Sequence, residues 1–105
     1  MSMTPQIFGQ EKPEANELTM LYTVPVNKSA QVTIFVCNQT SGGETFSIQL
    51  RRNLATDETY ISRNTVLASN GVFAFSSIGL NSGQSIYVQS MGGNASFTAT
   101  GMEFA

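Results

Sequence analysis

The sequence predicts an all-β protein: an antiparallel β-sandwich of about seven or eight strands, preceded by an extended N-terminal arm. Short segments rich in β-branched and aromatic residues recur at a spacing of roughly 8–12 residues. Gly, Asn and Ser cluster between these segments, as they do in tight turns. No window shows sustained helical periodicity. The strand pattern leaves jelly-roll and immunoglobulin-like topologies open, because the two differ in the order in which strands are connected.

Residues 1–17 are predicted to form the arm, and residues 18–105 the sandwich. The arm contains Pro5 and Pro13, and proline interrupts regular strand pairing. Ile7 and Phe8 are an apolar pair within this polar stretch. They could be buried in the protein's own sandwich or could anchor the arm on a neighbouring subunit, and the sequence favours neither alternative.

The first strand of the sandwich is predicted at 18–24, where Pro25 ends it. The second, at 30–39, has the strongest pattern, because both of its faces are apolar. Val32, Ile34 and Val36 point one way, and Phe35 and Cys37 point the other. Such a segment is typical of a central strand that is covered on both faces.

Three more strands follow. Residues 44–52 alternate between apolar and polar side chains, which indicates a half-buried antiparallel strand with Phe46, Ile48 and Leu50 facing inward. Residues 58–68 give a weaker pattern. The dipeptide Asn70-Gly71 predicts a tight turn that leads into a strand at 72–80.

The last two strands are predicted at 84–90 and 95–104. In the final strand Phe97 and Ala99 share one face, whereas Met102 and Phe104 have the opposite parity. Gly101 lies between the two pairs, so a β-bulge there is expected to bring all four side chains to the same face.

The composition excludes several classes of function. Charged residues make up 11% of the 105-residue chain, against roughly 25% in ordinary soluble domains. With a net charge of -2 and five cations, binding to nucleic acid through phosphates is not expected. No apolar run is long enough to span a membrane, and the N-terminus lacks the features of a signal peptide.

The residue inventory also argues against catalysis. The chain has no His and a single Cys, Cys37, so neither a Ser-His-Asp triad nor a zinc site is expected. Asp57 and Glu58 are adjacent, and neighbouring strand residues point to opposite faces, so they do not form a glycosidase pair. We therefore expect a non-enzymatic protein without a metal or a cofactor.

Five residues are candidates for contacts with a partner protein: Ile7, Phe8, Arg51, Arg52 and Arg63. The arginines could bind a partner's carboxylates in bidentate fashion, because the planar guanidinium matches carboxylate geometry. The alternative is a solvated strand end with weak surface ion pairs.

Several motifs resemble those of a group of small structural proteins of tailed bacteriophages. They are Gly9-Gln10 and Pro13, the strand Leu21-Tyr22-Thr23-Val24-Pro25, the strand ending Cys37-Asn38, Tyr60, and the segments 79–88 (GLNSGQSIYV) and 94–103 (NASFTATGME). The resemblance covers nearly the whole chain. The group usually has an acid before its Ile-Tyr-Val strand, where this chain has Gln84-Ser85.

The resemblance implies a virion structural protein, either a head decoration (cement) protein or a tail component. A decoration protein would bind the major capsid (coat) protein on the capsid exterior and stabilise its subunits, after synthesis in the host cytoplasm. It is expected to be a homo-oligomer, and a trimer would fit local threefold positions of the shell. One alternative is a tail, baseplate or fibre module that binds host glycans. Tyr22, Tyr60 and Tyr87 could stack on sugar rings, but the sequence favours positions at the rim of the core for them. Another alternative is a free carbohydrate-binding module.

Overall fold

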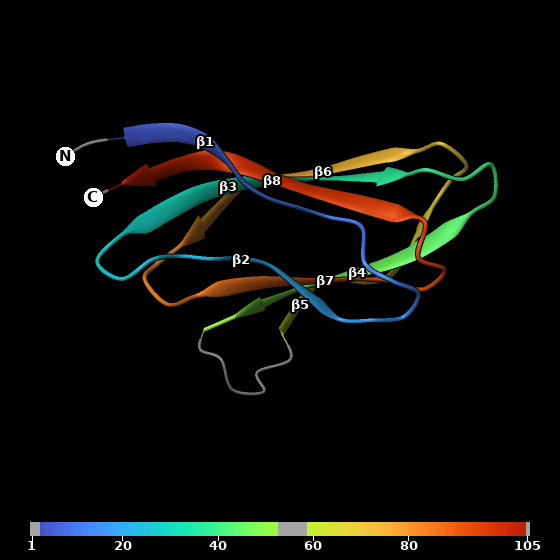
Figure 1. Ribbon diagram of the computed structural model, residues 1–105, viewed down its shortest axis with the longest axis horizontal. Coiled ribbons are helices and arrows are strands. Elements are labelled where there is room, and N and C mark those ends of the chain that lie inside the picture. Colours follow the sequence, from blue (N-terminus) through green and yellow to red (C-terminus); the bar gives the residue numbers. More distant parts are fainter. Residues whose placement is uncertain (1–2, 53–58, 105) are drawn as a thin grey trace.

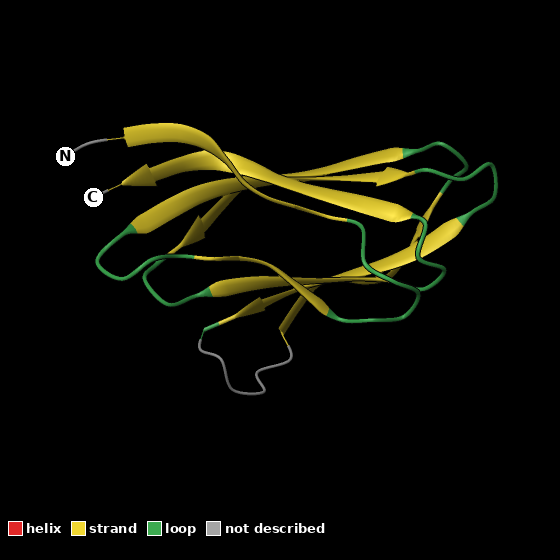
Figure 2. Cartoon of the chain, in the orientation of Figure 1, coloured by secondary structure: helices red, strands yellow, loops and turns green. Residues whose placement is uncertain are grey.

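The computed structural model describes residues 3–52 and 59–104, and it confirms the predicted antiparallel β-sandwich (Figure 1). Among these residues there is no helix long and apolar enough to cross a membrane. The eight strands, shown in yellow in Figure 2, are β1 (Met3–Glu11), β2 (Thr19–Thr23), β3 (Ser29–Asn38), β4 (Glu44–Arg51), β5 (Thr59–Leu67), β6 (Val72–Leu80), β7 (Ser85–Ser90) and β8 (Ala95–Phe104).

The strands form two four-stranded antiparallel sheets, which Figure 1 shows edge-on, one above the other. Sheet A has the order β1-β8-β3-β6, and sheet B has the order β2-β7-β4-β5. Successive strands cross from one sheet to the other, except that β4 and β5 pair within sheet B. This is the strand order of a jelly roll, so the topology that the sequence left open is the jelly-roll one.

The core lies between the two sheets and contains the alternate residues that the sequence predicts to face inward. Phe46 and Ile48 of β4 are fully buried, as is Ile34 of β3. The Phe46 ring meets the ring of Phe97 on the facing sheet edge-on, with centroids 6.2 Å apart. Such edge-to-face contacts add to the stabilisation that burial of the two rings provides.

The predicted N-terminal arm is wrong for residues 3–11, which form β1 at the edge of sheet A and pair antiparallel with β8. Pro5 does not prevent this, because an edge strand has one side that needs no hydrogen-bond donor, and Pro13 lies beyond the strand's end. A register shift between Ile7 and Gly9 makes Phe8 the extra residue of a bulge. Phe8 therefore packs against the core, while Ile7 faces outward and is 62% exposed.

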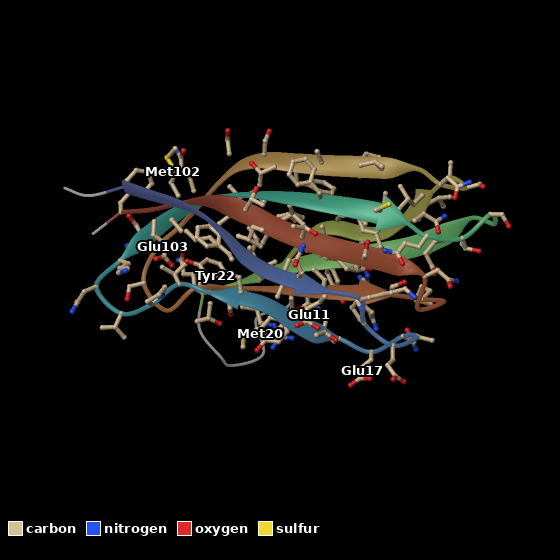
Figure 3. All side chains as sticks on the ribbon, turned by 45° about the horizontal axis from the view of Figure 1, so that its top comes forward. Glu11, Glu17, Met20, Tyr22, Met102 and Glu103 are labelled. Carbon is tan, nitrogen blue, oxygen red and sulfur yellow. The ribbon has the colours of Figure 1, made fainter. Side chains whose placement is uncertain are left out.

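The predicted bulge at Gly101 is also wrong. The pairing of β3 with β8 runs without a shift through Val32 and Gly101. Met102 therefore faces outward, and Glu103 points toward Tyr22, as Figure 3 shows. The strand keeps its regular alternation because the inward position 103 is occupied by a carboxylate that finds polar partners, so no change of parity is needed.

The polar partners of Glu103, which are Tyr22 and Lys28, link the two sheets on the β1–β2 side of the sandwich, which we call the closed side. The Tyr22 hydroxyl donates a 2.7 Å hydrogen bond to Glu103 Oε2, and Lys28 Nζ lies 3.4 Å from Glu103 Oε1. Phe8 stacks on the Tyr22 ring with centroids 4.3 Å apart. Burial raises the pKa of the Tyr22 hydroxyl, and the hydrogen bond to Glu103 and the charge of Glu103 raise it further.

Two buried polar side chains organise the turns at the other end of the sandwich. The Glu44 carboxylate accepts hydrogen bonds from the backbone N–H groups of Thr45, Gly92 and Asn94 at 2.8–3.0 Å. Asn38 Nδ2 donates to backbone carbonyls of two different turns: Gly42, Leu67 and Ala68. These contacts connect β4 to the β7–β8 turn and β3 to the β5–β6 turn, so they fix loops that are distant in sequence.

Candidate interaction surfaces

The outer face of sheet A has no charged side chain at any of its described positions. We call it the neutral face, and the cross-strand register assigns to it Ile7 and Gln10 of β1, Gln31, Thr33, Phe35 and Cys37 of β3, Val72 and Ala74 of β6, and Ser96, Thr98, Thr100 and Met102 of β8. Hydroxyl-bearing and apolar side chains are mixed on it, as the cross-strand pairs Thr33–Thr100 and Phe35–Thr98 show.

Large apolar side chains of the neutral face are open to solvent. Ile7 is 62% exposed, Val72 65%, Phe35 42% and Met102 41%. The expectation that β3 is covered on both faces is therefore wrong for a single chain, because the described strands make two layers and nothing in them lies over Phe35. Contiguous exposed apolar side chains of this kind mark interaction sites.

The outer face of sheet B has a different chemistry. Its central part, which we call the arginine face, consists of Gln49, Arg51, Tyr60, Arg63 and Tyr87. The Arg51 guanidinium lies 4.1 Å from the Tyr87 ring centroid, and its Nε donates to Gln49 Oε1 at 3.0 Å. Arg63 lies 5.0 Å from the ring centroid of Tyr60. One cation–π contact and one hydrogen bond thus hold Arg51 in one orientation.

A cavity of about 360 Å³ opens where β4 and β6 end. Leu50 and Leu80 give it an apolar lining, and Arg51, Arg52 and Gln84 contribute polar groups; Gly79 completes the lining. The candidate residues Arg51 and Arg52 are thus brought together at the margin of the arginine face. In the parts of the chain that the structure describes, no group of three or more His, Cys, Asp or Glu side chains could hold a metal ion.

The five candidate contact residues do not form one site. Arg51, Arg52 and Arg63 belong to sheet B or its border, Ile7 lies on the neutral face, and Phe8 packs on the core.

The three candidate tyrosines also lie in different parts of the structure. Tyr22 is buried beside Phe8, whereas Tyr60 and Tyr87 belong to the arginine face and lie under guanidinium groups. Asp57 and Glu58 lie outside the described residues.

Sequence reasoning missed the neutral face and the roles of Asn38 and Glu44. The neutral face had a detectable signal, because the outward parity of both 31–37 and 96–102 contains no charge. Asn38 and Glu44 gave none, since their partners are backbone groups of remote turns. No protein-family model matches the chain, and neither the comparison with curated proteins nor that with solved structures gives a match.

The split between Ile7 and Phe8 gives a direct test of β1. Phe8→Ser should lower the free energy of unfolding by about 2–3 kcal/mol, because it removes the ring that packs on Tyr22. In a single chain, Ile7→Ser should change it by less than about 0.5 kcal/mol, because that side chain is 62% exposed there. Urea denaturation of both variants measures the difference, and equal effects would contradict the assignment of β1 to the sandwich.

Proposed function

We propose that this chain is a virion structural protein of a tailed phage, a capsid decoration (cement) protein that binds the outer head surface and stabilises the coat subunits. It acts as a rigid body with no catalytic step. The jelly roll supplies the rigidity, and its two outer faces present different chemistries to different neighbours. Many copies on one shell make weak individual contacts effective through avidity.

The resemblance to phage proteins supports this proposal, and the residues that carry it lie largely in the core. The motif Leu21-Tyr22-Thr23-Val24-Pro25 provides Leu21, Tyr22 and Val24, which are all buried. The Ile-Tyr-Val strand provides Ile86 and Val88, which are fully buried. The shared motifs therefore consist largely of residues that form the core of the sandwich. Core residues do not contact a partner, so proteins that share these motifs can bind different partners in different phages.

The arginine face is the single observation that supports docking on coat protein most directly. The guanidinium of Arg51 is oriented by Tyr87 and Gln49 before any partner arrives. A pre-oriented guanidinium loses little side-chain entropy when it binds, and it matches a carboxylate with two parallel hydrogen bonds. We therefore propose that the arginine face contacts carboxylates on the coat subunits.

Binding of the purified protein to phage heads tests this proposal. Arg51→Gln should weaken attachment by about tenfold or more, since loss of one member of an interfacial charge pair leaves the other unpaired. Lys12→Gln is the matched control, because it removes the same charge from an exposed position after β1. Equal binding of the two variants would contradict docking through the arginine face. Gold-labelled antibody against the protein should decorate heads in electron micrographs, and label confined to tails would replace this proposal with the tail alternative.

The tail, baseplate or fibre alternative has one observation in its favour. Tyr60 and Tyr87 share a face with Gln89, and rings beside an amide of this kind can bind a sugar. In this structure Arg51 and Arg63 lie over those rings, so a sugar would have to displace them. A glycan array probed with the protein and with Arg51→Ala separates the two cases, because a glycan site would bind better once Tyr87 is uncovered.

A further inference from the structure

We propose that the neutral face pairs with the same face of a second copy of this chain, related by a twofold axis. The contact would stack two sandwiches through their sheets A and leave both arginine faces open. This inference concerns self-association and does not rest on the proposed function.

The charge distribution favours a second copy as the occupant. A twofold contact brings one surface against itself, so a surface whose charges have one sign would meet charges of the same sign across the contact. Charged residues of the described chain lie elsewhere: Glu11, Lys12, Glu14 and Glu17 at the end of β1 and in the β1–β2 connection, Lys28 and Glu103 at the closed side, Glu44 in the turns, and Arg51, Arg52 and Arg63 with sheet B. The neutral face can therefore meet itself without like-charge repulsion.

The size of the face is of the same order as the area that a stable dimer buries. Strands β3 and β8 at its centre have 10 residues each. Four strands about 4.8 Å apart, with a rise of about 3.3 Å per residue, give a projected area of roughly 600 Å². The accessible area of protruding side chains exceeds this projection, and stable interfaces bury about 800 Å² per partner.

The side chains of the face suit contact between two sheets. Phe35 lies on a central strand and is 42% exposed, with Thr98 opposite it on β8 and Ala74 opposite it on β6. Small neighbours around a protruding ring leave space for a ring from the other copy. Hydroxyls such as those of Thr33 and Thr100 can form hydrogen bonds across the contact, so their burial does not leave unsatisfied polar groups.

Sedimentation equilibrium at micromolar concentration tests the pairing with a matched set of variants. The wild-type chain should have the mass of a dimer, and Phe35→Glu should weaken association by at least about tenfold. Val72→Glu and Val66→Glu form the matched pair: both valines are exposed, at 65% and 72%, but Val72 lies on the neutral face and Val66 on the outer face of sheet B. Val72→Glu should weaken the dimer and Val66→Glu should not. A wild-type monomer or trimer would overturn the proposal, as would a dimer that Val66→Glu disrupts and Phe35→Glu does not.

Cys37 provides a second measurement on the unaltered chain, which keeps the test valid if a variant fails to fold. It is the single cysteine, and it lies on the neutral face two residues from Phe35. If the faces pair, a maleimide should modify Cys37 more slowly as protein concentration rises through the dissociation constant. A rate that does not depend on concentration across the transition seen in sedimentation would contradict pairing through this face.

Discussion

Replacement of Gly101 by alanine is expected to cause the largest loss of stability in this chain, about 3–5 kcal/mol. Gly101 has a φ of 153°, a conformation that residues with a Cβ rarely adopt. A Cβ built at this position would overlap the backbone carbonyl oxygen of Gln31 on β3. Backbone cannot move aside as a flexible side chain can, so β3 and β8 would separate at the centre of sheet A.

Gly79→Ala is the matched control for this prediction. Gly79 lies on β6 in the same sheet, and a Cβ there would have no atom within 4 Å. We expect this variant to be as stable as the wild type or slightly more so, because alanine lowers the entropy of the unfolded chain. Thermal denaturation followed by circular dichroism compares the two. Similar melting temperatures for Gly101→Ala and Gly79→Ala would show that β3 and β8 do not approach as closely as described.

Glu44→Gln is expected to cost about 2–4 kcal/mol at neutral pH, because the carboxylate receives three backbone N–H groups that an amide nitrogen cannot satisfy. Burial by itself would raise the pKa of Glu44, but the hydrogen bonds from Thr45, Gly92, Asn94 and the Ser90 side chain outweigh it and lower the pKa below 4.5. The ionised carboxylate is therefore favoured by folding. Its contribution is present above the pKa of the unfolded chain and is lost as the pH falls through the lowered value.

Urea denaturation at several pH values measures this contribution. The difference in unfolding free energy between wild type and Glu44→Gln should be largest near pH 7 and should shrink as the pH falls below 4.5. Glu17→Gln, which removes the same charge from an exposed position, should change the unfolding free energy by less than about 0.5 kcal/mol. A difference for Glu44→Gln that stays constant with pH would mean that ionisation of Glu44 does not stabilise the fold.

The sequence predicted seven of the strands to within one or two residues, because each carries its own periodicity and is bounded by turn residues. The sequence analysis missed β1, because prolines argue against a strand unless it lies at a sheet edge. The partner of β1 is β8, at the opposite end of the chain, so local sequence could not show that β1 is an edge strand. The bulge at Gly101 was predicted from parity alone. Parity could not show that Glu103 has partners in Tyr22 and Lys28, which come from other strands.

The candidate contact residues were chosen by residue type, but the role of each one depends on its position in the fold. Arg51 lies on an outer face, where the Tyr87 ring orients its guanidinium. Phe8 has a structural role, because it is the extra residue of a bulge in β1. Topology could not be derived, since the order of strands in a sheet depends on contacts between segments that are remote in sequence. The parity of 31–37 and 96–102 already showed two uncharged strand faces, but only the register showed that they lie side by side on one sheet.

The position of β8 between β1 and β3 also constrains how the chain can fold. During synthesis β1 emerges early, but its partner follows only after most of the chain has been made, which takes about 5–20 seconds at ribosomal rates of about 5–20 residues per second. Until then β1 has no partner strand in the sheet, and β3 has one unpaired edge. Pairings of such long sequence separation also slow folding to milliseconds or seconds. The nascent protein therefore has a period in which its most apolar strand is open to aggregation, and slower translation should lengthen it.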